Sequence, residues 1–132
     1  MSARTRPNIV DSSGWLEFFA DTPAGAQFAR AIEATGTLIV PAVCILEVFR
    51  VILRARGEGD ALQAAAAMHQ GQVVVLDSPL ALMAAKLGVE HKLPLADSIV
   101  YATGQHVGGI VWTQDDDFDG LADVQYFPKG KR

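Results

Sequence analysis

Acidic side chains follow two apolar segments of this chain, at points where a strand is expected to end. Asp11 comes directly after the apolar pair at 9–10, and Asp115 follows the apolar run 110–112 after two polar residues. Asp116 and Asp117 stand beside Asp115. Because the carboxyl ends of parallel strands meet at one edge of a sheet, carboxylates placed there are candidates for a shared site.

Two further acidic residues lie near the starts of predicted helices. Asp97 falls in the first turn of a helix expected after Pro94, and Glu47 falls in the second turn of a helix expected after Pro41. A helix that follows a strand begins at the edge where that strand ends. Asp11, Glu47, Asp97 and Asp115 are therefore expected to converge in one crevice.

Four carboxylates in one crevice predict a metal site. Like charges packed together are costly unless a cation neutralises them. An all-oxygen set without histidine favours Mg²⁺, with Mn²⁺ as a possible substitute, over Zn²⁺. A water on such an ion can act as a nucleophile, and two ions roughly 3.5–4 Å apart would stabilise both the attacking and the leaving oxygen of a phosphodiester.

Each acidic position also has a purely structural interpretation. Asp11 could cap the helix that starts near Trp15, and Asp97 is favoured by the helix dipole. The run 115–117 has the composition of a solvated turn, which leaves open which of its three aspartates points into the site. Glu47 could pair with Arg50 or Arg54 on its own helix, and these arginines could equally contact substrate phosphates at the rim of the site.

The pattern of apolar segments predicts an α/β fold. Short apolar strands alternating with helices indicate a parallel sheet covered on both faces, a three-layer α/β/α sandwich with five strands. Strands are expected at 9–10, 37–40, 72–76, 110–112 and 124–127, the third of them fully buried. Helices are expected at 15–20, 23–34, 42–56, 60–70, 78–91 and 95–106, with Thr22-Pro23 and Ser78-Pro79 as cap-and-proline starts.

Composition limits the class of protein. The 132 residues suit a single domain spanning 1–132, and half of them are hydrophobic. The net charge of −4 has the wrong sign for a protein that binds nucleic acid by charge alone, unless part of it belongs to a cation site. The single cysteine, Cys44, is expected to be buried. Neither a signal peptide nor a membrane span is recognisable, so we expect a cytoplasmic protein.

Four segments, in order and across nearly the whole chain, resemble the motifs of the PIN domain, and more narrowly those of VapC-type toxins of type II toxin–antitoxin systems. The segment 9–15 is similar to the family's opening, an acidic residue followed by two small hydroxyl residues. Segments 41–48, 93–102 and 112–118 are similar to its second, third and last motifs. Each motif alone is weak evidence, whereas four in register are strong.

The resemblance implies a PIN-like sandwich that performs metal-dependent cleavage of RNA as an endoribonuclease, a hydrolase of phosphodiester bonds. By motif, Asp11, Glu47, Asp97 and Asp115 would be the catalytic quartet. Asp11, Asp97 and Asp115 would hold Mg²⁺, with Asp117 as a plausible fifth member. The hydroxyls of Thr113 and Ser13 would orient Asp11, and Arg50 would support the site.

The resemblance also implies a homodimer and a cognate VapB-like antitoxin. The predicted helices around 43–53 and 61–68 carry more apolar surface than one sheet face needs, so we expect an antitoxin groove and a dimer interface there. A non-catalytic PIN-like binding module is the main alternative. A phospho-acceptor domain, with Lys129 as its lysine, is less favoured because it leaves Glu47 without a role.

Overall fold

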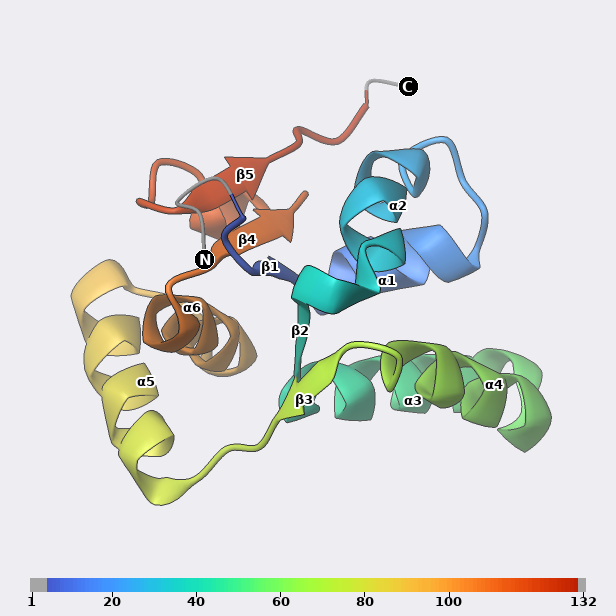
Figure 1. Cartoon of the computed structure of the whole chain (residues 1–132), viewed down its shortest axis with the longest axis horizontal. Coiled ribbons are helices and arrows are strands. Elements are labelled where there is room, and N and C mark those ends of the chain that lie inside the picture. The colour runs from blue at the N-terminus through green and yellow to red at the C-terminus, as the bar shows by residue number, and fades with distance from the viewer. Residues whose placement is uncertain (1–4, 131–132) are drawn as a thin grey trace.

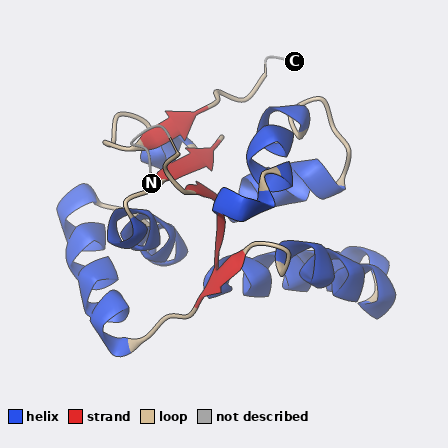
Figure 2. Cartoon of the chain, in the orientation of Figure 1, coloured by secondary structure: helices blue, strands red, loops and turns tan. Residues whose placement is uncertain are grey.

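The computed structural model describes residues 5–130, which form an α/β/α sandwich around one parallel sheet (Figures 1 and 2). The strand order is β3-β2-β1-β4-β5, and every neighbouring pair is parallel. The strands are β1 (Asn8–Val10), β2 (Leu38–Pro41), β3 (Gln72–Val74), β4 (Ile110–Thr113) and β5 (Val124–Tyr126). The predicted fold class is confirmed.

Within residues 5–130, six α-helices cover the two faces of the sheet. They are α1 (Ser12–Phe19), α2 (Ala26–Glu33), α3 (Ala42–Arg56), α4 (Glu58–Met68), α5 (Ser78–His91) and α6 (Leu95–Val107). In Figure 1 the sheet runs down the middle of the molecule, with α5 and α6 on one side and α1 to α4 on the other. No helix among the described residues is long and apolar enough to cross a membrane.

The chain reverses its direction across the sheet between β1 and β4. From β1 it proceeds outward through β2 to β3, and it then returns to place β4 on the other side of β1. Val10 pairs with Trp112, so these two strands end at the same level. Such a reversal leaves a crevice at the carboxyl ends of the two strands. Asp11 and the 115–117 run both follow strands that end at this crevice.

Burial is greatest in the central strand and in the aromatic side chains packed on it. Ile9 and Val10 of β1 are fully buried, as are Trp15 of α1 and Phe28 of α2. The side chain of Cys44 is buried as predicted. Both faces of β1 are therefore covered, which explains why this strand lacks alternating polar residues.

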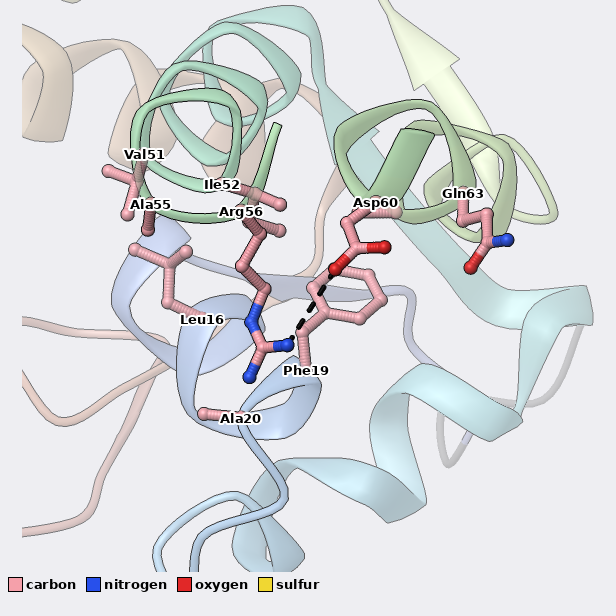
Figure 3. Close-up of a pocket in the computed structure, with 10 residues that line it drawn as sticks. Leu16, Phe19, Ala20, Val51, Ile52, Ala55, Arg56, Asp60 and Gln63 are labelled. Carbon is pink, nitrogen blue, oxygen red and sulfur yellow. Dashed lines mark ion pairs between the residues drawn. The ribbon is translucent and has the colours of Figure 1, made fainter. Parts of the chain in front are cut away.

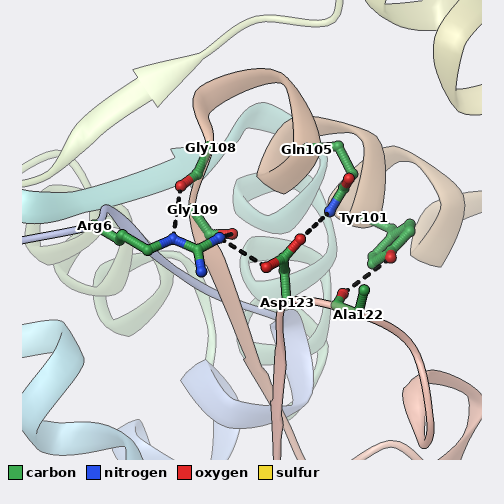
Figure 4. Close-up of polar contacts among 7 residues, drawn as sticks. All are labelled: Arg6, Tyr101, Gln105, Gly108, Gly109, Ala122 and Asp123. Carbon is green, nitrogen blue, oxygen red and sulfur yellow. Dashed lines mark hydrogen bonds and ion pairs between the residues drawn. The ribbon is translucent and has the colours of Figure 1, made fainter. Parts of the chain in front are cut away.

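A cluster of polar contacts closes the amino-terminal edge of the sheet, opposite the crevice (Figure 4). Arg6 forms an ion pair with Asp123 at 2.9 Å and donates to the carbonyl oxygens of Gly108 and Gly109. Gln105 donates to the second oxygen of Asp123 at 3.1 Å. These contacts connect the segments that enter β1, β4 and β5.

The predicted start of the second helix at Pro23 is wrong, because α2 begins at Ala26. The Thr22 hydroxyl accepts a hydrogen bond from the Gly25 N–H at 3.0 Å, so it stabilises a turn before the helix. A Cβ at Gly25 would lie 2.4 Å from the Glu17 carbonyl oxygen. The close approach of this turn to α1 is a tertiary contact that the local pattern does not contain.

The third strand and the helix after it also differ from the prediction. The expected fully buried strand 72–76 ends at Val74 and is an edge strand, half-buried at Val73 and Val74. Val75 and Leu76 are 65% and 45% exposed. The cap of α5 is Asp77, whose carboxylate accepts from the Leu80 N–H, and not Ser78.

Candidate active site

The carboxylate of Asp11 is buried at the end of β1 and is held by three donors. One oxygen accepts from the Ser13 hydroxyl at 2.8 Å and from the Gly14 N–H at 3.0 Å. The other accepts from the Thr113 hydroxyl at 2.6 Å. Asp11 is thus also the N-cap of α1. Burial raises its pKa, and the three hydrogen bonds oppose that rise.

Thr113 connects Asp11 to the acidic turn after β4. While its hydroxyl donates to Asp11, the same oxygen accepts from the Asp115 N–H at 2.9 Å. The Asp115 carboxylate in turn accepts from the Asp117 N–H at 3.0 Å, where the 3₁₀ turn Asp116–Phe118 begins. Hydrogen bonds that begin at Thr113, the last residue of β4, therefore fix the geometry of this turn.

Three carboxylates lie close enough together to share a cation. Oxygens of Asp97, Asp115 and Asp117 all lie within 4.8 Å of one another. Asp97 comes from the first turn of α6, and the other two come from the turn after β4. This acidic group contains Asp115 and Asp117 and not the exposed Asp116, so the two alternate members of the run face Asp97.

The electrostatics of the acidic group favour a bound cation. Burial, followed by the charges of Asp115, Asp11 and Asp117, raises the pKa of Asp97 to about 7. A half-buried carboxylate among like charges holds its proton until a cation replaces it. The donor set consists of oxygen atoms alone, which suits Mg²⁺ or Mn²⁺. The residues present thus fit a hard divalent ion.

Asp11 lies beside the acidic group and interacts with it. Its charge acts on Asp97, and the charge of Asp115 acts on Asp11. Because both Asp11 oxygens already accept hydrogen bonds, its contribution to the site includes fixing β1, α1 and β4 relative to one another. The role of Asp11 as a direct metal ligand stays a prediction.

Glu47 approaches the site from α3. Its carboxylate is half-buried and accepts a hydrogen bond from the Ser12 hydroxyl. Within the described part of the chain it forms no ion pair with Arg50 or Arg54, both of which are exposed. The alternative in which Glu47 pairs with an arginine of its own helix is therefore not seen among the described ion pairs.

The buried thiol of Cys44 shows that the acids from distant segments converge. Burial raises the pKa of Cys44, and the charges of Asp11, Glu47 and Asp97 raise it further. The Cys44 side chain thus lies near acids from three segments: the residue after β1, α3 itself and the first turn of α6.

Two polar residues next to the acids are not among the residues predicted from the sequence. Ser12 contacts Glu47, whereas the sequence indicates only Ser13 of the same pair. Gln114 is 6% exposed and donates to Glu17 at 2.9 Å, which connects the turn after β4 to α1. Each of these residues lies between two predicted site residues in the sequence, and this position is the signal that could have identified it.

Among the described residues, two hollows with apolar lining residues lie apart from the acids. The first is a groove of about 630 Å³ between α1, α3 and α4, and Figure 3 shows the Arg56–Asp60 ion pair among the residues that line it. Leu16 and Phe19 line it from α1, and Val51 and Ala55 line it from α3. The second, along another face of α3, is lined by Ala42, Ile45, Leu46, Phe49, Arg50 and Leu53.

The raised pKa of Asp97 predicts a pH dependence of stability in the metal-free protein. Between 3.8, its ordinary pKa, and about 7, the folded chain keeps a proton that the unfolded chain has lost. The free energy of unfolding should therefore fall as pH rises through this window. Thermal unfolding in chelator at several pH values measures it. An equally steep fall in Asp97→Asn would contradict the assignment.

Residues 9–124 match the PIN domain family. A comparison with curated protein sequences finds no match. Among solved structures, a toxin–antitoxin complex from Klebsiella pneumoniae is similar with a TM-score of 0.80 and 19% identity, over 92% of this chain and 99% of that one.

Two further structures share the fold. VapC20 of Mycobacterium tuberculosis, a toxin that cleaves the sarcin–ricin loop, has a TM-score of 0.72 and 20% identity, over 89% of this chain and 96% of that one. DNA-bound VapBC from Salmonella typhimurium has a TM-score of 0.69 and 10% identity, over 93% of this chain and 98% of that one. At these identities the likeness concerns the fold, whereas the family match spans most of the sequence. The chain belongs to the PIN domain family.

Proposed function

We propose that this protein is a magnesium-dependent endoribonuclease and the toxin of a VapC-type toxin–antitoxin pair. The observation that carries the proposal is the acidic group, in which oxygens of Asp97, Asp115 and Asp117 lie within 4.8 Å of one another beside buried Asp11. Its place at the reversal between β1 and β4 suits a ligand site. The structurally similar VapC20 is named as a toxin that cleaves the sarcin–ricin loop, which supports a cleavage reaction on a related substrate.

Each acid has a part in the proposed hydrolysis. Asp97, Asp115 and Asp117 would hold the ion, and Asp11 would orient the turn or add a ligand oxygen. When bound, Mg²⁺ would supply activation of a water molecule and neutralisation of the phosphodiester charge. Glu47 would accept the proton of the attacking water. Arg50 and Arg54, exposed on α3, contact phosphates at the rim. The net charge of −4 is compatible with RNA because the acids are part of the ion site.

Cleavage of RNA should depend on the acids and on the ion. Asp97→Asn and Asp11→Asn should each lower kcat/KM by at least about 10²-fold, since they remove charge that holds or orients the ion. Chelator should abolish cleavage of a fluorescent RNA, and added Mg²⁺ should restore it. Asp116→Asn is the matched control, because Asp116 is exposed and lies outside the acidic group.

The same assay separates an enzyme from a binding module. Wild-type rates in either acid variant, or cleavage that persists in chelator, would refute the proposed mechanism. RNA binding without cleavage by the wild-type protein would favour the non-catalytic alternative.

We assign the groove between α1, α3 and α4 to an apolar segment of the cognate antitoxin. Val51 is 46% exposed although it is apolar and lines the groove beside Leu16 and Phe19. Solved complexes of similar fold contain toxin and antitoxin together, which supports such a partner. An amphipathic helix or an extended segment would bury this surface.

A charge placed in the groove should weaken antitoxin binding. We expect Val51→Asp to lower the affinity by at least about tenfold, because an unpaired carboxylate would be buried in the complex. Titration calorimetry with the antitoxin measures the effect. Val89→Asp, on α5 and 82% exposed, is the control for added charge. Equal affinity of both variants would place the antitoxin elsewhere.

We also assign the second hollow, along α3, to a second copy of the chain. Leu46 and Leu53 are 61% and 42% exposed there, beside Phe49. Light scattering at micromolar concentration should show a dimer, and Leu46→Glu should shift it to a monomer because the charge would meet apolar surface. A monomeric wild-type protein, or a dimeric Leu46→Glu variant, would contradict this interface.

A further inference from the structure

We propose that Ser12 is a positioning residue that holds the Glu47 carboxylate at the acidic site, through a hydrogen bond between the first residue of α1 and the second turn of α3. The inference rests on the proposed function, because Glu47 is the group assigned to accept the proton. Ser12 follows Asp11 directly and is half-buried. Its hydroxyl donates to one oxygen of Glu47.

Fewer hydrogen bonds hold the Glu47 carboxylate than hold that of Asp11. Asp11 accepts from Ser13, Gly14 and Thr113. Glu47 is half-buried and has a longer side chain with more rotatable bonds. Among the described residues, the donor that the structure gives to its carboxylate is Ser12.

An exposed arginine offers Glu47 an alternative partner on its own helix. Arg50 lies one turn further along α3 and is exposed, so an outward rotamer of Glu47 would approach its guanidinium. The bond from Ser12 opposes this rotamer and keeps the carboxylate beside the first turn of α1.

The contact also orients the carboxylate for chemistry. Because Ser12 donates to one oxygen, the other oxygen remains an acceptor for the proton of the attacking water. Loss of the Ser12 hydroxyl should therefore slow the chemical step and leave RNA binding nearly unchanged. The effect should appear in kcat and much less in KM.

A pair of nearly isosteric variants tests the hydroxyl alone. Ser12→Val should lower kcat by about 10- to 100-fold with KM changed less than about twofold, the range for partners that orient an active-site ligand. Ser12→Thr, which keeps the hydroxyl in a side chain shaped like valine, should recover most of the lost activity. Thermal unfolding of both variants checks that each is folded.

A double-mutant cycle tests whether Ser12 acts through Glu47. In a Glu47→Gln background, adding Ser12→Val should lower kcat by less than about twofold, because the group that Ser12 positions is already altered. The proposal is overturned if Ser12→Val lowers kcat by the same factor in that background as in the wild type. It is also overturned if Ser12→Thr lowers kcat as much as Ser12→Val does.

A structural measurement separates this proposal from the proposed function. In crystals of the wild-type protein, the Glu47 carboxylate should contact Ser12, and in Ser12→Val it should turn toward solvent. If the wild-type protein cleaves no RNA and Glu47 still turns outward only in Ser12→Val, the ribonuclease proposal fails and the positioning role stands. An unchanged Glu47 conformation in Ser12→Val would overturn the positioning role whatever the activity.

Discussion

The buried carboxylate of Asp11 is the point on which the arrangement of the site depends. A charge at 3% exposure is costly unless hydrogen bonds satisfy it, and three donors do so here. Those donors come from the first turn of α1 and from the end of β4, so satisfying one carboxylate fixes the strand, the helix and the neighbouring strand together. Thr113 extends the constraint to the Asp115 backbone. The hydrogen bonds at the ends of the central strands β1 and β4 therefore determine where Asp115 of the acidic group lies.

The two ends of the sheet have different chemistry. At the amino-terminal edge, opposite charges meet in the Arg6–Asp123 pair, and carbonyl oxygens accept the remaining donors of Arg6 (Figure 4). At the carboxyl-terminal edge, like charges meet, and the described residues place no cation side chain in an ion pair with them. The first arrangement stabilises the fold by itself. The second brings like charges together, and a bound cation would neutralise them, which is the physical basis of the proposed ion site.

Helices α1 and α3 connect the acidic site to the apolar groove. At their amino-terminal ends Ser12 and Glu47 are joined by a hydrogen bond, and further along the same two helices Leu16 and Phe19 face Val51 and Ala55 across the groove (Figure 3). A partner seated in that groove would therefore contact the same helices that carry two of the site residues. The proposed partner surface and the proposed active site thus lie on the same two helices but involve different side chains.

By itself the sequence determined the order of strands and helices, the parallel sheet and the crevice at which the acids meet. These features follow from local periodicity and from the rule that parallel strands end at one edge. The tertiary structure alone decided the start of α2, since Gly25 must approach the Glu17 carbonyl, and the exposure of Val75 and Leu76 at the sheet edge. It also decided that Asp117 and not Asp116 joins Asp97 and Asp115, and that Ser12 reaches Glu47. Contacts between residues far apart in the chain depend on how the elements pack, and no local pattern contains that information.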